Sequence, residues 1–146
     1  MGKKTENNTS NPVAAVFGAA GHTGRFVIAE LLRRGITPIA VARDGKALSA
    51  ANFPANITFK RQATIDDAGS LDRALHGAQA VINCAGPFID SAEAVAAAAL
   101  RAEIHYLDVA AEQVITARML EKFDVPARNA GIAVVPAMPF TADLPI

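Results

Sequence analysis

A short apolar run that stops at three evenly spaced glycines is the feature that most constrains this fold. Residues 13–17 are apolar and suit a buried strand, and Gly18, Gly21 and Gly24 follow at three-residue spacing. Residues 25–34 then carry apolar side chains at helical spacing. A strand, a glycine turn and a helix in this order bring backbone N–H groups and the positive end of the helix dipole to one point. The stretch therefore predicts a site for the diphosphate of a dinucleotide.

Each small residue of this turn has a physical role. Gly18 lets the chain leave the strand in a tight turn, Ala20 and Gly21 let the backbone approach a phosphate, and Gly24 lets the helix pack close to the strand. The spacing is G-x-x-G-x-x-G, with Ala20 where the common fingerprint has its second glycine, so a purely structural turn is the alternative interpretation. The residues that we expect to contact the cofactor here are Gly18, Ala20, Gly21, His22, Thr23 and Gly24.

Strand and helix patterns alternate along the rest of the chain. Expected strands are 13–17, 37–42, 57–61, 80–84, 104–109 and 132–136; expected helices are 25–34, 47–51, 66–76, 90–102 and 112–130, the last with a break near 124–126. An Asp90–Glu93 pair is expected to cap the alanine-rich helix. This alternation predicts an α/β fold: a doubly wound, mostly parallel sheet of about six strands in the order 3-2-1-4-5-6. Its ligand crevice would lie over the carboxyl ends of the first and fourth strands.

Composition excludes several functions. Fourteen basic and fourteen acidic side chains cancel, so no basic excess points to nucleic acid. The only cysteine, Cys84, cannot form an intrachain disulfide, which fits a reducing compartment, and we expect a cytoplasmic protein. No apolar run approaches the roughly 20 residues of a membrane span. The three histidines lack ligand spacing, so no metal site is expected.

The end of the second strand indicates which dinucleotide binds. NAD sites usually carry an acidic residue there, whereas this chain has Arg43, with Lys46 one turn further on. A guanidinium can fork onto a 2′-phosphate and stack on adenine, so Arg43 favours NADP over NAD. A solvated surface arginine is the alternative. Asp44 could serve a ribose, but its place before a helical stretch favours capping.

The segment after the fourth strand would form a second wall of the crevice. Cys84, Ala85, Gly86 and Pro87 would support the dinucleotide, and Phe88 would cover an apolar face. An ordinary strand-to-helix turn is the alternative. Cys84 has no evident base partner and is interpreted as a small buried hydrophobe.

The fifth strand carries polar residues but no assignable catalyst. Alternation places Tyr106 and Asp108 on one side and His105 on the other. Asp108 is expected to cap the next helix. No catalytic residue is assigned.

With these segments placed, the sequence resembles the N-terminal cofactor domain of saccharopine dehydrogenase-like oxidoreductases. The matching segments are residues 18–25, 41–43, 81–88, 105–108 with Glu112, and 130–136. The resemblance implies a nicotinamide-dependent oxidoreductase, often using NADP. Departures at Thr64, Glu103 and Ala110–Ala111 bear on the substrate more than on the phosphate turn.

The polar N-terminal residues and the resemblance together predict a domain organisation. Residues 1–12 would be a disordered arm, 13–136 the dinucleotide-binding domain, and 137–146 the start of a linker to a substrate domain that this chain lacks. That second domain would bind the small-molecule substrate, so this half would bind NADP without turnover. The sequence leaves open whether the protein forms a homodimer.

Two other functions compete with this one, and the sequence argues against the first of them. A short-chain dehydrogenase needs a Tyr-x-x-x-Lys pair, but the only tyrosine, Tyr106, is followed by Ala110. A non-catalytic NADP sensor of the NmrA type would suit the glycine turn and Arg43 equally well.

Overall fold

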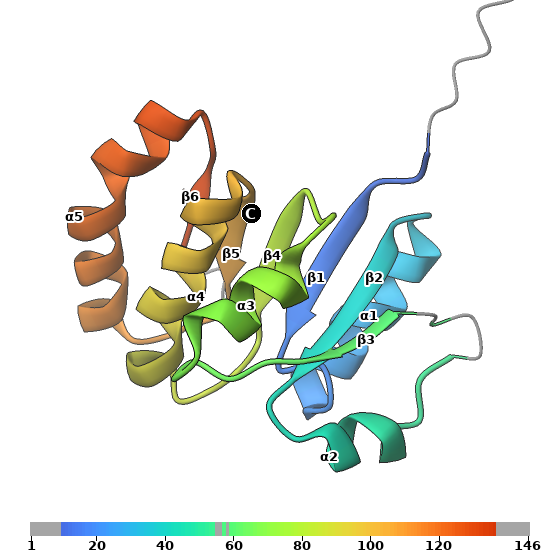
Figure 1. The fold of residues 1–146 in the computed structure, drawn as a ribbon. Helices are drawn as coiled ribbons and strands as arrows, with labels where there is room; N and C mark the ends of the chain where they lie inside the picture. The colour runs from blue at the N-terminus through green and yellow to red at the C-terminus, as the bar shows by residue number, and fades with distance from the viewer. Residues whose placement is uncertain (1–9, 55–56, 58, 137–146) are drawn as a thin grey trace, which may run out of the picture.

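The computed structural model describes residues 10–54, 57 and 59–136, and within them six parallel strands form one sheet in the order β3-β2-β1-β4-β5-β6 (Figure 1). The strands are β1 (Val13–Phe17), β2 (Thr37–Ala42), β3 (Phe59–Gln62), β4 (Ala80–Asn83), β5 (His105–Asp108) and β6 (Val134–Val135). The helices are α1 (His22–Arg33), α2 (Gly45–Ala50), α3 (Ala68–Leu75), α4 (Phe88–Ala102) and α5 (Gln113–Ala130). The predicted fold class and strand order are confirmed. The predicted arm and linker lie almost wholly outside the described residues.

Two apolar layers enclose the sheet. Alternate side chains of β1 point to opposite faces: Phe17 joins the larger core under α3, α4 and α5, and Val16 joins the smaller core under α1 and α2. Figure 1 shows α3, α4 and α5 in front of the sheet and α1 behind it. Because β1 is buried on both sides, its sequence is apolar throughout, as parallel sheets require.

The register places the two predicted site segments together. Within the central pair of strands, Phe17 of β1 lies opposite Asn83 of β4. Both strands therefore end at the same level. The glycine turn after β1 and the loop after β4 begin side by side at the carboxyl edge of the sheet.

Two aspartates cap helices as their positions in the sequence indicate. The Asp44 carboxylate accepts a hydrogen bond of 2.8 Å from the Lys46 N–H at the start of α2. The Asp67 carboxylate accepts one of 3.1 Å from the Ser70 N–H at the start of α3. The capping interpretation of Asp44 is confirmed, and that carboxylate is engaged on the protein itself.

The predicted Asp90–Glu93 cap is wrong. α4 begins at Phe88, two residues earlier, with Pro87 as its N-cap and no side-chain capping bond. Glu93 instead faces α5, where its carboxylate binds Lys122 at 2.7 Å. Pro87 itself is extended, with φ −73° and ψ 135°, and the first helical residue is Phe88.

The predicted break in the last helix is also wrong. α5 runs without interruption from Gln113 to Ala130 with Pro126 inside it. Phe123 and Ala127, on either side of Pro126, are both buried against the core, and this packing holds the helix together across the missing N–H. In the described part of the chain, no helix is long and apolar enough to cross a membrane.

Candidate cofactor-binding site

Two positions of the turn after β1 have no room for a side chain. Gly18 has a φ of +82°, and a Cβ there would stand 2.8 Å from the backbone nitrogen of Ala85. A Cβ on Gly24 would stand 2.2 Å from the carbonyl oxygen of Gly18. Glycine is therefore required at both, once for the approach of the loop after β4 and once for the seating of α1.

Some N–H groups of this turn are already engaged. The N–H groups of Gly18 and Ala19 both donate to the Val41 carbonyl of β2, at 2.9 and 3.0 Å. The Gly21 N–H donates to the Gly18 carbonyl at 3.1 Å. These bonds fix the turn to the neighbouring strand, and they leave Gly18 and Gly21 as shape-giving positions rather than phosphate donors.

The following N–H groups are the ones directed outward. Those of Ala20, His22, Thr23 and Gly24 make no hydrogen bond with any residue that the structure describes. They open α1, where unpaired donors and the helix dipole attract an anion. The His22 ring packs edge-on against Phe26, with ring centroids 4.9 Å apart, so at His22 the backbone is the group available to a phosphate.

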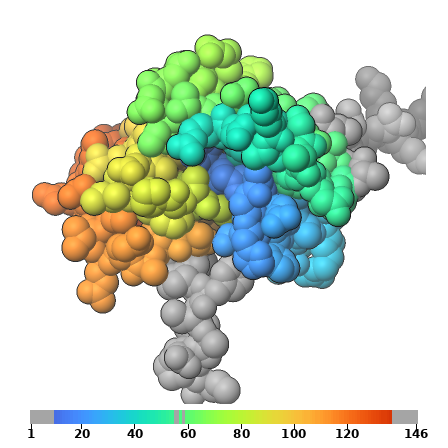
Figure 2. Space-filling view, turned by 90° about the horizontal axis from the view of Figure 1, so that it is seen from below, coloured from blue at the N-terminus to red at the C-terminus, as the bar shows by residue number. Residues whose placement is uncertain are grey.

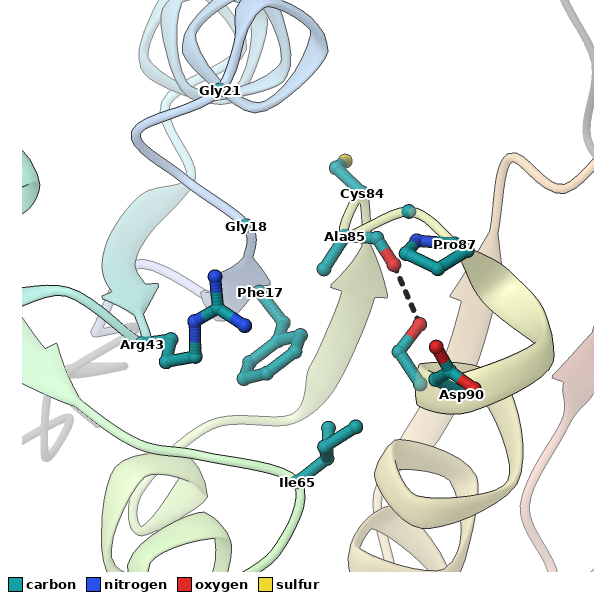
Figure 3. A pocket seen from close by; sticks show the side chains of 11 residues that line it. Phe17, Gly18, Gly21, Arg43, Ile65, Cys84, Ala85, Pro87 and Asp90 are labelled. Carbon is teal, nitrogen blue, oxygen red and sulfur yellow. Dashed lines mark hydrogen bonds between the residues drawn. The ribbon is translucent and has the colours of Figure 1, made fainter.

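A cavity of about 400 Å³ opens beside this turn at the carboxyl edge of the sheet. Figure 2 shows this edge, where the blue segment of β1 and α1 lies recessed between the teal α2 region and the yellow α4. Seven predicted site residues line the cavity: Gly18, Gly21, Arg43, Cys84, Ala85, Gly86 and Pro87. Four further lining residues were not predicted: Phe17, Ile65, Asp90 and Ser91. Segments that follow β1, β2, β3 and β4 thus meet at one hollow (Figure 3).

The remaining predicted residues lie around this cavity rather than in it. Lys46 lines a shallow groove beside α2, and Thr23 lines a separate groove against α1. Phe88 is half-buried and packs on the larger core. For these residues (Ala20, His22, Thr23, Gly24, Lys46 and Phe88), as for the seven that line the cavity, contact with a cofactor stays a prediction.

A buried hydrogen-bond network holds the loop after β4. The Asn83 side chain is fully buried, and its Oδ1 accepts from the Ala85 N–H at 3.0 Å. Its Nδ2 donates to Ser91 Oγ at 3.1 Å and to the Tyr106 hydroxyl at 3.3 Å. Ser91 Oγ donates in turn to the Ala85 carbonyl at 2.6 Å. Both polar groups of Ala85 are therefore fixed from beneath, and the cavity wall is preorganised.

The network continues into β5 and corrects one expectation. The Tyr106 hydroxyl donates to the Asp108 carboxylate at 2.8 Å, and the Ala110 N–H donates to the same carboxylate at 3.1 Å. Both side chains are fully buried on one side of β5, as alternation predicts. Asp108 does not cap α5, however, because the N-cap of that helix is Glu112. His105 lies on the other side, where its Nδ1 accepts from the Ala133 N–H.

The electrostatics of the site point to binding rather than to nucleophilic chemistry. Burial raises the pKa of the Cys84 thiol to about 12, so it stays protonated near neutral pH. Burial also raises the pKa of the Tyr106 hydroxyl well above its usual value. The interpretation of Cys84 as an unreactive hydrophobe agrees with this environment.

Comparison with known proteins identifies the family. The model of the saccharopine dehydrogenase NADP-binding domain matches residues 14–135, most of the chain. This chain belongs to that family. The resemblance drawn from the glycine turn and the 81–88 segment is confirmed, and so is the assignment of an NADP-binding domain.

Relatives of this NADP-binding domain include longer proteins. The chain is 27% identical, over 141 residues, to a protein of Arabidopsis thaliana described as a "probable mitochondrial saccharopine dehydrogenase-like oxidoreductase". The alignment covers 86% of this chain and 31% of the plant protein. The chain thus spans about a third of the length of that relative.

Solved structures share the fold. The apo saccharopine dehydrogenase (L-Glu forming) of Saccharomyces cerevisiae superposes with a TM-score of 0.73 at 19% identity, covering 88% of this chain and 27% of the yeast chain. The triphenylmethane reductase of Citrobacter sp., complexed with NADP(H), superposes with a TM-score of 0.63 at 22% identity. The superposition covers 84% of this chain and 48% of the reductase chain. At these identities the likeness shows the Rossmann-like architecture.

Proposed function

We propose that this domain holds NADP(H) along the carboxyl edge of its sheet and supports hydride transfer between the nicotinamide and a substrate bound by further polypeptide of an oxidoreductase. The nicotinamide supplies the hydride chemistry when the cofactor is bound. The chain's own contribution is to fix the diphosphate and the adenosine end. By itself the chain binds the cofactor without turnover.

The observation that carries this proposal is the position of Arg43. Its guanidinium lines the same cavity as the glycine turn and projects from the end of β2 (Figure 3). The neighbouring Asp44 carboxylate is engaged on the Lys46 N–H, so it is not held toward a ribose. A cation at this strand end suits the 2′-phosphate that distinguishes NADP from NAD.

The burial of two titratable groups on β5 supports binding without turnover. Tyr106 and Asp108 are fully enclosed by protein, and the Asn83 amide links the Tyr106 hydroxyl to the residues that line the cavity. An amide does not relay protons at neutral pH, so this network positions groups and moves no proton. Cys84 is protonated for the reason given above.

The test is a binding titration of NADPH and NADH with the wild-type chain and with Arg43→Ala. Loss of a charge-assisted phosphate contact weakens binding by about 1.5–3 kcal/mol, roughly ten- to a hundredfold. We expect this loss for NADPH and little change for NADH, because NADH has no 2′-phosphate.

The matched control is Arg128→Ala. Arg128 is an exposed arginine of α5 whose guanidinium pairs with Asp124 at 3.1 Å, and it does not line the cavity. Its loss should leave both affinities unchanged. Equal binding of NADPH and NADH by the wild type, unaltered by Arg43→Ala, would overturn the proposal.

A further inference from the structure

The cavity beside the glycine turn has two chemically different sides. The Arg43 guanidinium stands on one side, and Asp90 and Ser91 from the first turn of α4 stand on the other. Figure 3 shows the Phe17 ring and the Ile65 side chain between them. A cation and a pair of oxygen-bearing side chains therefore face one another across an apolar floor.

The α4 side of the cavity offers acceptors only. Ser91 Oγ donates its single hydrogen to the Ala85 carbonyl and accepts one hydrogen bond from Asn83 Nδ2. It can therefore accept one more hydrogen bond but cannot donate another. The Asp90 carboxylate forms no hydrogen bond or ion pair with the part of the chain described. Asp90 is exposed, and an ionised carboxylate can only accept, so a ligand that binds on this side would present an N–H or O–H donor to it.

The position of Arg43 decides which part of the dinucleotide this donor belongs to. If Arg43 holds the 2′-phosphate, as proposed above, the base on the same ribose is the part within reach of the cavity. The side chains of Phe17, Ile65 and Pro87 give the cavity apolar walls, against which a planar base could pack. Adenine carries one exocyclic donor, its 6-amino group.

We propose that Asp90 determines base specificity by accepting a hydrogen bond from the 6-amino group of adenine, with Ser91 Oγ as a second acceptor beside it. The inference rests on the proposed NADP site and extends it to recognition of the base. Asn83 is the positioning residue, because its amide fixes the Ser91 hydroxyl in its acceptor state. The backbone also orders this corner: the Asp90 N–H donates to the Pro87 carbonyl at 3.2 Å.

The test compares NADPH with deamino-NADPH, in which hypoxanthine replaces adenine. That ligand keeps the 2′-phosphate but presents a carbonyl oxygen where adenine has its amino group, so lone pairs would face the carboxylate. We expect the wild type to bind deamino-NADPH about tenfold more weakly than NADPH. In Asp90→Ala the two affinities should agree within about twofold.

The ratio of the two affinities separates the base contact from charge effects. Asp90→Ala also removes a negative charge near the bound phosphates, which shifts both affinities in the same direction. The matched control is Glu93→Ala, one turn further along α4, because the Glu93 carboxylate binds Lys122 away from the cavity. This variant should keep the wild-type ratio.

The outcomes distinguish this inference from the proposed function. Equal wild-type binding of NADPH and deamino-NADPH, with NADPH still preferred to NADH, overturns the base contact and leaves the NADP site standing. A tenfold ratio that survives in Asp90→Ala also overturns it. The 6-amino group would then bind an acceptor other than Asp90, and Asp90 would be left as a partner for a ribose hydroxyl. Failure of the wild type to bind either ligand overturns both proposals.

Discussion

Replacing Gly24 with alanine tests the glycine with the least room for a Cβ among the described residues. Alanine normally stabilises a helical position by about 1 kcal/mol relative to glycine, so helix propensity alone predicts a gain in α1. The contacts predict the opposite. A Cβ would stand 2.2 Å from the Gly18 carbonyl oxygen and 2.8 Å from the Ala19 Cα, and neither backbone atom can rotate away.

The magnitude follows from these distances. Restoring ordinary contact requires α1 to move away from the turn by about 1 Å, and overpacking of this kind costs about 1–3 kcal/mol. Because the contacted atoms belong to the backbone, we expect the upper end of this range, about 3 kcal/mol, and subtracting the propensity gain of about 1 kcal/mol leaves a net loss of about 2 kcal/mol in the free energy of unfolding. For a domain of this size that corresponds to a fall in Tm of about 6–8 °C. Urea unfolding followed by circular dichroism, together with a thermal scan, measures both quantities.

Gly69→Ala is the matched control for this prediction. Gly69 also lies inside a helix, α3, but a Cβ there would meet only side-chain ends, at 3.2 Å from Arg73 and 3.3 Å from Asp67. The Arg73 end can shift, and the Asp67 carboxylate needs to give by only a few tenths of an ångström while it caps Ser70, so this variant should be as stable as the wild type or more stable. A Gly24→Ala protein that matches the wild type in midpoint and slope would refute the packing argument.

Two further predictions concern the buried groups beneath the cavity. Tyr106→Phe removes a donor to the buried Asp108 carboxylate and an acceptor for Asn83, so the free energy of unfolding should fall by about 1–3 kcal/mol; urea midpoints within experimental error of the wild type would contradict this. Because the folded pKa of Cys84 lies near 12 and above its ordinary value, the unfolded chain releases this proton first, and stability should fall as the pH rises from about 9 toward 12. Cys84→Ala should flatten that decline in unfolding free energy measured across the same pH range, and an unchanged slope would contradict the assignment to Cys84.

The strand order could be predicted because the central strands carry a strong signal. The β1 segment has no charged residue and is buried on both faces, a pattern that indicates the interior of a parallel sheet. The edge strand β3 has a weaker signal. Three of its four residues are exposed, so its alternating pattern placed the strand at 57–61 rather than at Phe59–Gln62.

Four of the eleven lining residues could not be predicted from the sequence, because their place in the cavity depends on long-range geometry. Ile65 follows β3, and nothing local shows that its side chain turns into the same hollow as Arg43. Asp90 was interpreted as a cap, since Asp followed by Glu at three-residue spacing is typical of helix starts. The signal that could have identified Asp90 as a site residue is its position three residues after Pro87, directly following the loop after β4 that lines the crevice.

Gly18 and Gly21 are equivalent in the motif but not in the structure. A Cβ on Gly21 would meet nothing closer than 3.4 Å, whereas one on Gly18 would press on the backbone of Cys84 and Ala85. The glycine turn therefore rests directly on the loop that Asn83 holds in place. Because the two walls of the site touch at Gly18, a side chain there displaces the phosphate turn and the base cavity together. A side chain at Gly21 would extend into the cavity without pressing on the loop after β4.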